Sequence, residues 1–101
     1  MNTEKDDLID IGTKKAFKYF HEHYIMTETD LYRFIDSALF LGRTKLIKYL
    51  FKLGCNKYLV KALYELYPDY SYDDVEVLKI YLKYSPNDSK SYIEHVFTSF
   101  T

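Results

Sequence analysis

A ten-residue amphipathic segment occurs three times along this chain, with offsets of 30 and 31 residues. The three copies are residues 15–24, 45–54 and 76–85. Equivalent places hold Lys18, Lys48 and Lys79 at one position and the apolar pairs Ala16/Phe17, Leu46/Ile47 and Val77/Leu78 at another. A period of this length is typical of helical repeat proteins, in which each unit buries its apolar face only against its neighbours.

Apolar residues recur three and four positions apart within each copy, which is the period of an α-helix. A second apolar segment with the same period precedes the later copies, at residues 30–41 and 58–66, and residues 8–11 indicate a shorter one before the first copy. Thr27 and Asp30 have the spacing of a helix-capping pair. The chain therefore alternates between helices in pairs.

The sequence predicts an all-α fold, an open stack of about three helix-turn-helix units in a single domain of residues 1–101. The units are about residues 5–24, 29–54 and 57–85, followed by a capping helix at residues 89–100. A turn is expected at residues 85–88, because Ser-Pro-Asn-Asp is typical of turns. Stacking the units buries their apolar faces together.

Residues 36–56 resemble one unit of the ankyrin repeat. A small residue stands in the first helix (Ala38), a glycine at the turn between helices (Gly42), a Leu/Ile-rich run in the second helix, and a glycine at its end (Gly54). The resemblance implies an ankyrin-like stack that binds proteins, similar to the divergent ankyrin-like proteins of large DNA viruses. At the Gly42 turn we expect a positive φ, and Gly42→Val should cost roughly 1 kcal/mol or more.

Other parts of the chain depart from the ankyrin pattern. The resemblance covers about residues 10–85, but Asp73 occupies the third turn-glycine position, and about seven extra residues lie near 67–73. The Thr-Pro that opens the family's first helix is absent, and the links between units are short. Short links leave little room for the protruding hairpins with which ankyrin proteins often bind.

Composition limits the class of protein. The chain is 48% hydrophobic and 29% charged, which is typical of a folded domain. It has no apolar run of membrane-spanning length and no basic, apolar leader at its start, so we expect an intracellular protein with no membrane partner. A single cysteine, Cys55, agrees with a reducing compartment.

No residue pattern predicts catalysis, a cofactor or a metal site. His21 and His23 are two positions apart, so on a helix they point to different sides and cannot chelate one ion. Cys55 occupies a small packing position of the repeat. Acidic residues at 73–76 are interpreted as favourable charge at the start of a helix. We therefore expect a protein that is not an enzyme.

The middle of the chain is basic. Residues 42–61 contain six cations and no acid, while the whole chain has a net charge of −1. The six are Arg43, Lys45, Lys48, Lys52, Lys57 and Lys61. They form a candidate surface for an acidic protein or a nucleic-acid backbone, although a solvated helix face is the favoured interpretation. The net charge argues against general polyanion binding.

Aromatic and apolar residues form the preferred candidate surface for a partner protein. The predicted partner-binding residues are Phe40, Leu41, Tyr64, Tyr67, Tyr70 and Tyr72. Rigid aromatic side chains contribute most of the binding energy of typical interfaces, whereas isolated exposed lysines contribute little. The sequence thus predicts an interaction module that binds and modulates a host protein, with a homodimer contact and a nucleic-acid-associated role as alternatives.

Overall fold

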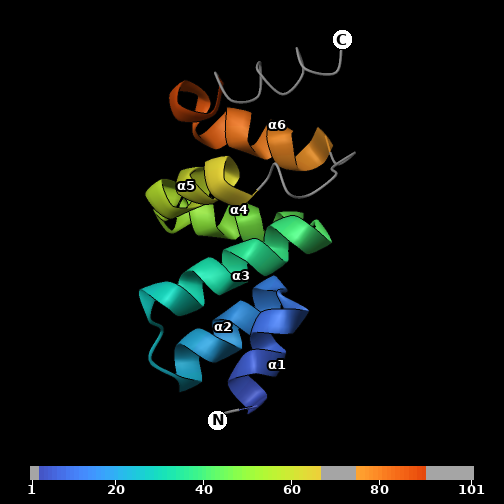
Figure 1. The fold of residues 1–101 in the computed structure, drawn as a ribbon, viewed down its shortest axis with the longest axis vertical. Coiled ribbons are helices and arrows are strands. Elements are labelled where there is room, and N and C mark those ends of the chain that lie inside the picture. Colours follow the sequence, from blue (N-terminus) through green and yellow to red (C-terminus); the bar gives the residue numbers. More distant parts are fainter. Residues whose placement is uncertain (1–2, 67–74, 91–101) are drawn as a thin grey trace.

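The computed structural model describes residues 3–66 and 75–90 of the chain (Figure 1). Six helices are α1 (Thr3–Ile11), α2 (Lys14–His23), α3 (Glu28–Leu41), α4 (Thr44–Lys52), α5 (Asn56–Leu66) and α6 (Val75–Tyr84). Residues 86–90 are also helical, and the described ranges contain no strand. The all-α prediction is confirmed for this part of the chain, and most of the predicted capping helix at 89–100 lies outside it.

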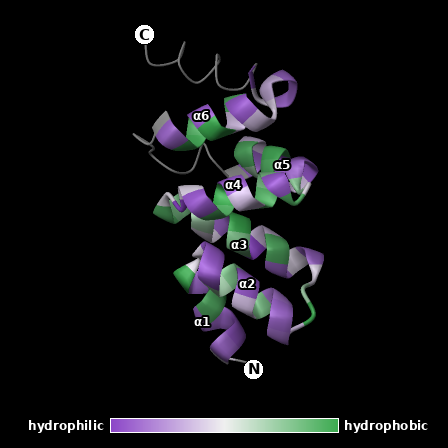
Figure 2. Cartoon of the chain, turned by 180° about the vertical axis from the view of Figure 1, so that it is seen from behind, coloured by the Kyte–Doolittle hydropathy of each residue, from purple (hydrophilic) through white to green (hydrophobic). Residues whose placement is uncertain are grey.

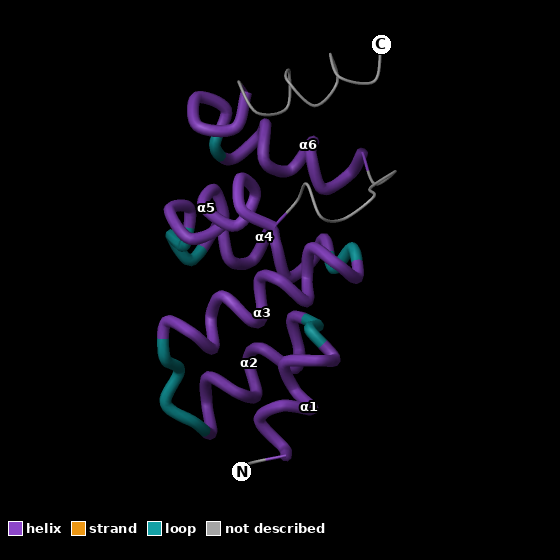
Figure 3. Tube along the Cα trace, in the orientation of Figure 1, coloured by secondary structure: helices purple, strands orange, loops and turns teal. Residues whose placement is uncertain are grey.

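The helices form two rows. In the first row α1 packs on α3 and α3 packs on α5, and in the second α2 packs on α4 and α4 on α6. First-row helices run toward one edge of the molecule and second-row helices return from it (Figures 1 and 3). The predicted equivalence of the three lysine-bearing segments holds at the level of helices and burial, because they lie in α2, α4 and α6. The finer prediction of an ankyrin arrangement stays a prediction.

Burial follows the helical period of the sequence. In α4, Leu46, Ile47 and Leu50 are fully buried, and a buried side chain of this kind contributes about 2 kcal/mol or more to stability. Ala16/Phe17 and Val77/Leu78 are buried as expected. Tyr81 is also inside the core, and its hydroxyl donates a 2.7 Å hydrogen bond to the Leu59 carbonyl, which satisfies a polar group that would be costly to bury alone.

Two kinds of connection reverse the chain (Figure 3). One edge, the turn edge, holds the tight turns at Gly12 and Gly42, whose φ values are +63° and +66°. Side chains disfavour this left-handed conformation, so the positive φ expected at Gly42 is confirmed. The opposite edge, the loop edge, holds the connections at residues 24–27 and 53–55. There Thr27 and Asp30 form the predicted capping box, with two hydrogen bonds of 3.1 Å.

The predicted turn at residues 85–88 is wrong in its extent. Only Ser85 interrupts the helices, and residues 86–90 are helical. Proline suits the first position of a helix because its missing N–H would have no partner there. The Ser89 N–H donates to the Ser85 carbonyl at 3.0 Å, so the Ser-Pro pair begins a helix as well as ending α6.

Candidate functional site

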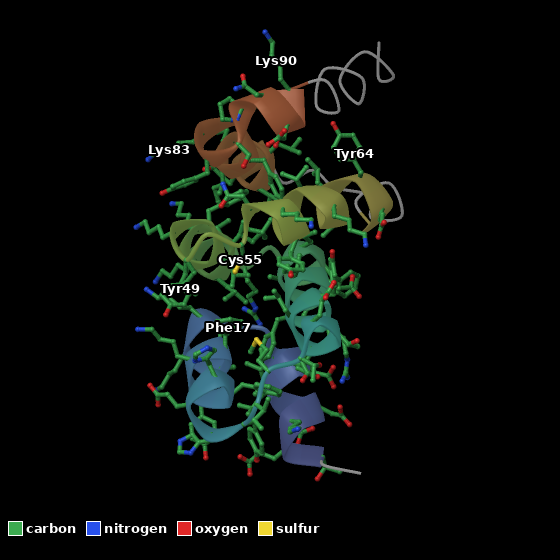
Figure 4. The ribbon with its side chains drawn as sticks, turned by 90° about the vertical axis from the view of Figure 1, so that its left-hand side faces the viewer. Phe17, Tyr49, Cys55, Tyr64, Lys83 and Lys90 are labelled. Atoms are coloured by element: carbon green, nitrogen blue, oxygen red, sulfur yellow. The ribbon has the colours of Figure 1, made fainter. Side chains whose placement is uncertain are left out.

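Charge is segregated between the two rows of helices. Helices α2, α4 and α6 carry eight lysines and two glutamates. Helices α1, α3 and α5 carry eight carboxylates and four cations. The second row is therefore net +6 and the first net −4, although the whole chain is almost neutral. Figure 4 shows Tyr49 and Lys83 on the second-row side of the molecule and Tyr64 on the first-row side.

The structure divides the predicted basic segment 42–61. Lys45, Lys48 and Lys52 lie on α4 in the basic row, whereas Lys57 and Lys61 lie on α5 in the other row. The Lys61 Nζ atom is 5.2 Å from the centre of the Tyr32 ring on α3. The lysines of α4 are instead combined with those of α2 and α6, which are distant in sequence.

A groove of about 580 Å³ opens at the turn edge, between the starts of α2 and α4. Its lining contains five cations and no carboxylate. The lining residues are Thr13, Lys14, Lys15, Lys18, Gly42, Arg43, Thr44, Lys45 and Leu46. Sequence reasoning named Arg43 and Lys45 but missed Lys14 and Lys15. The equivalence of the two turns at Gly12 and Gly42 was the sequence signal that could have brought Lys14 and Lys15 together with Arg43 and Lys45.

The cations of this groove, called the turn groove below, have no anionic partner in the part of the chain that the structure describes. None of the five forms an ion pair with a carboxylate of the described residues. The Nε atom of Arg43 is buried and finds no hydrogen-bond partner within the described ranges. Lys14 and Lys18 place their Nζ atoms 4.8 and 5.3 Å from the centre of the same Tyr49 ring, a cation–π arrangement that orders both side chains.

Exposed apolar side chains lie at the same edge as the turn groove, although they do not line it. Phe40 is 65% exposed and Leu41 42% exposed, immediately before Gly42. Ile11 is 49% exposed at the equivalent place before Gly12. Figure 2 shows apolar ribbon at the ends of α1 and α3 next to hydrophilic ribbon where α2 and α4 begin. Two of the predicted partner-binding residues thus lie next to two of the predicted basic residues.

The predicted tyrosines are only partly within the described residues. Tyr64 is exposed, and its hydroxyl donates a 2.9 Å hydrogen bond to the Asp88 carbonyl. Tyr67, Tyr70 and Tyr72 lie outside the described residues. Of the predicted partner-binding residues, the structure therefore gives the exposure of Phe40, Leu41 and Tyr64.

The loop edge carries a second, smaller groove of about 440 Å³, whose lining includes Phe17, Leu53 and Cys55. Burial raises the pKa of the Cys55 thiol, which reduces its nucleophilic thiolate form near neutral pH. The ring of His21 stacks on Phe17. Among the described residues no three His, Cys, Asp or Glu side chains are grouped as metal ligands.

Comparison with protein-family models, with curated proteins and with solved structures gives no match to this chain. No helix in the described ranges has the length and apolar character needed to cross a bilayer.

Proposed function

We propose that this chain is a protein–protein interaction module that binds its partner at the turn edge. The observation that carries the proposal is the juxtaposition there of exposed apolar side chains, with Phe40 at 65% exposure, and a groove lined by five cations. A central aromatic anchor commonly contributes about 2 kcal/mol or more to an interface. Surrounding charges guide association and select partners. The complementary partner surface is an apolar patch bordered by acidic residues.

A protein is favoured over a nucleic acid by the charge of the whole molecule. Nucleic-acid-binding domains are usually strongly basic, whereas this chain has a net charge of −1. The net −4 of the first row opposes a long polyanion that extends beyond the second row. A nucleic-acid-associated role remains the second candidate because eight lysines share the second row.

The proposal includes the kind of module. Its likeness to the ankyrin repeat rests on Ala38, Gly42 and Gly54, and such proteins act by binding. We place the chain with the divergent ankyrin-like proteins of large DNA viruses, acting inside the cell on a host protein as an inhibitor or adaptor. Binding is the whole proposed activity, without catalysis or a cofactor.

The test compares three forms of the tagged chain in a pull-down from host-cell lysate. The first is unmodified, the second carries Phe40→Ser with Leu41→Ser, and the third carries Ile25→Ser as a matched control. Ile25 is 87% exposed at the loop edge, so the control also removes exposed apolar area. A partner retained by the unmodified and control forms should lose at least about tenfold in affinity with the double variant, equivalent to about 1.4 kcal/mol.

Circular dichroism must show that all three forms are folded. Equal retention by the double variant would exclude the turn edge as the binding surface. Loss of binding with Lys48→Glu, while the double variant still binds, would favour the basic row instead. Retention on immobilised DNA that is lost with added salt would favour the nucleic-acid candidate. Light scattering at several concentrations tests whether the partner is a second copy of the chain.

A further inference from the structure

We propose that the turn groove binds one phosphomonoester group, carried by a phosphorylated side chain of the partner protein. Lys15 and Lys45 stand at the starts of the two helices that border it, with Lys14, Lys18 and Arg43 completing the lining cations. The identity of the carrier rests on the proposed function, but the affinity of the groove for phosphate does not.

The charge of the turn groove favours a bound anion. Five cations share a lining with no carboxylate, and none has an ion-pair partner among the described residues. Like charges gathered in this way repel one another, and a bound anion removes that repulsion. The binding of a multiply charged anion in the groove is therefore electrostatically favourable.

Arg43 adds a buried hydrogen-bond donor to the lining of the turn groove. Its Nε atom is buried and has no hydrogen-bond acceptor among residues 3–66 and 75–90, and the residue lines the groove. A buried donor without a partner is uncommon in folded proteins and calls for an explanation. A phosphate oxygen is the acceptor that suits a guanidinium fork.

The backbone at the start of α4 adds N–H donors among the residues that line the groove. Helix α2 is capped by the Thr13 side chain, because the Ala16 N–H donates to Thr13 Oγ1 at 3.1 Å. Helix α4 has Arg43 at its N-cap and no side-chain cap. Its first N–H groups at Lys45 and Leu46 thus have no side-chain acceptor, and both residues line the groove.

Two of the five cations are held in place before any ligand binds. The Nζ atoms of Lys14 and Lys18 both lie over the Tyr49 ring. Ordering a flexible lysine on binding costs conformational entropy, and this contact reduces that cost.

A phosphomonoester fits these features better than the other anions. It carries close to two negative charges and three acceptor oxygens on one centre. A carboxylate carries one charge on two oxygens, and a nucleic-acid phosphodiester carries one charge per unit along a polymer. The net −1 of the chain and the acidic first row disfavour such a polymer.

Amide NMR of the full ¹⁵N-labelled chain tests the proposal directly. The probe is N-acetyl-phosphoserine amide, and N-acetyl-aspartate amide and a ten-nucleotide oligothymidylate are titrated separately, each against NaCl of equal ionic strength. We expect saturable shifts of the amides of residues 13–15 and 43–46 with the phosphoserine probe. Its affinity should exceed that of the aspartate probe by at least about tenfold and that of the oligonucleotide as well.

Matched variants locate the site. Lys15→Gln with Lys45→Gln removes two exposed groove cations and should weaken phosphoserine binding by at least about tenfold. Lys52→Gln with Lys57→Gln removes two exposed lysines outside the groove and should change it less than twofold. Arg43→Lys keeps the charge but removes the fork, and a loss of about threefold or more is expected.

Three outcomes would overturn the proposal. The phosphoserine probe does no more than the NaCl control, or the aspartate probe binds equally well, or the oligonucleotide binds more tightly. None of these outcomes depends on Phe40 or Leu41, so the pull-down still tests the proposed function independently. Conversely, failure of the pull-down would leave the phosphate titration fully interpretable.

Discussion

The two edges of the molecule both reverse the chain, but they complete their helix ends differently. At the loop edge, Thr27 and Asp30 cap α3 reciprocally. The Asn56 amide at the start of α5 donates a 3.2 Å hydrogen bond to the Ser85 hydroxyl after α6. At the turn edge, α4 begins at Arg43 without a side-chain cap. The start of α3 at the loop edge is thus satisfied by its own side chains, as is the start of α2 at the turn edge through Thr13, while the start of α4 leaves backbone donors without a side-chain acceptor.

This difference indicates which edge is adapted to hold something else. An unpaired buried donor and an uncapped helix start lower stability, and a protein under selection for stability alone would replace them easily. At the loop edge the start of α3 has local partners in the same kind of place, although the Ser89 hydroxyl, one turn after Ser85, is also buried without a hydrogen-bond partner among the described residues. The cations and donors of the turn edge are therefore better explained by an external ligand than by folding.

The largest expected effect is a difference in stability loss between alanine substitutions at Gly12, on the turn edge, and at Gly54, on the loop edge. At Gly12 an added Cβ would lie 3.0 Å from the Ser37 Cβ and the φ is +63°, so Gly12→Ala should cost about 2 kcal/mol from strain and overlap. Gly54 has a φ of +90° but no atom within 4 Å of an added Cβ. Gly54→Ala should cost about 1 kcal/mol from strain alone.

Urea unfolding of both glycine variants measures the difference in unfolding free energy. A larger loss for Gly54→Ala than for Gly12→Ala would mean that the loop edge, and not the turn edge, is the more tightly constrained connection. The unmodified chain under the same conditions is the reference.

The tight turn at Gly42 could be predicted from the sequence, whereas the grouping of the surface lysines could not. A glycine between two apolar helical runs predicts a tight turn locally, so Gly42 and the burial of Leu46 and Ile47 followed from the pattern. Which lysines share a surface depends on packing between helices distant in sequence. For that reason Lys57 and Lys61 were grouped with Lys45 although they lie in the other row, and Lys14 and Lys15 were missed.

A smaller effect is expected from the cap at the loop edge. Thr27→Ala removes the side-chain acceptor for the Asp30 N–H and should reduce the unfolding free energy by about 1 kcal/mol. Thr29→Ala is the matched control, because Thr29 is exposed within the first turn of the same helix. It should change stability by less than about 0.5 kcal/mol. Equal losses in the two variants would show that the loop edge does not depend on its capping box.

The smallest expected effect measures the repulsion in the turn groove itself. If the five cations repel one another, added NaCl should stabilise the unmodified chain by screening them. The variant with Lys15→Gln and Lys45→Gln has less repulsion to screen, so its Tm should rise by about 2 °C less between low and moderate salt. The variant with Lys52→Gln and Lys57→Gln controls for general salt effects and should behave as the unmodified chain does. An equal salt response of all three chains would mean that the cations of the turn edge do not interact, and the electrostatic distinction between the edges would be lost.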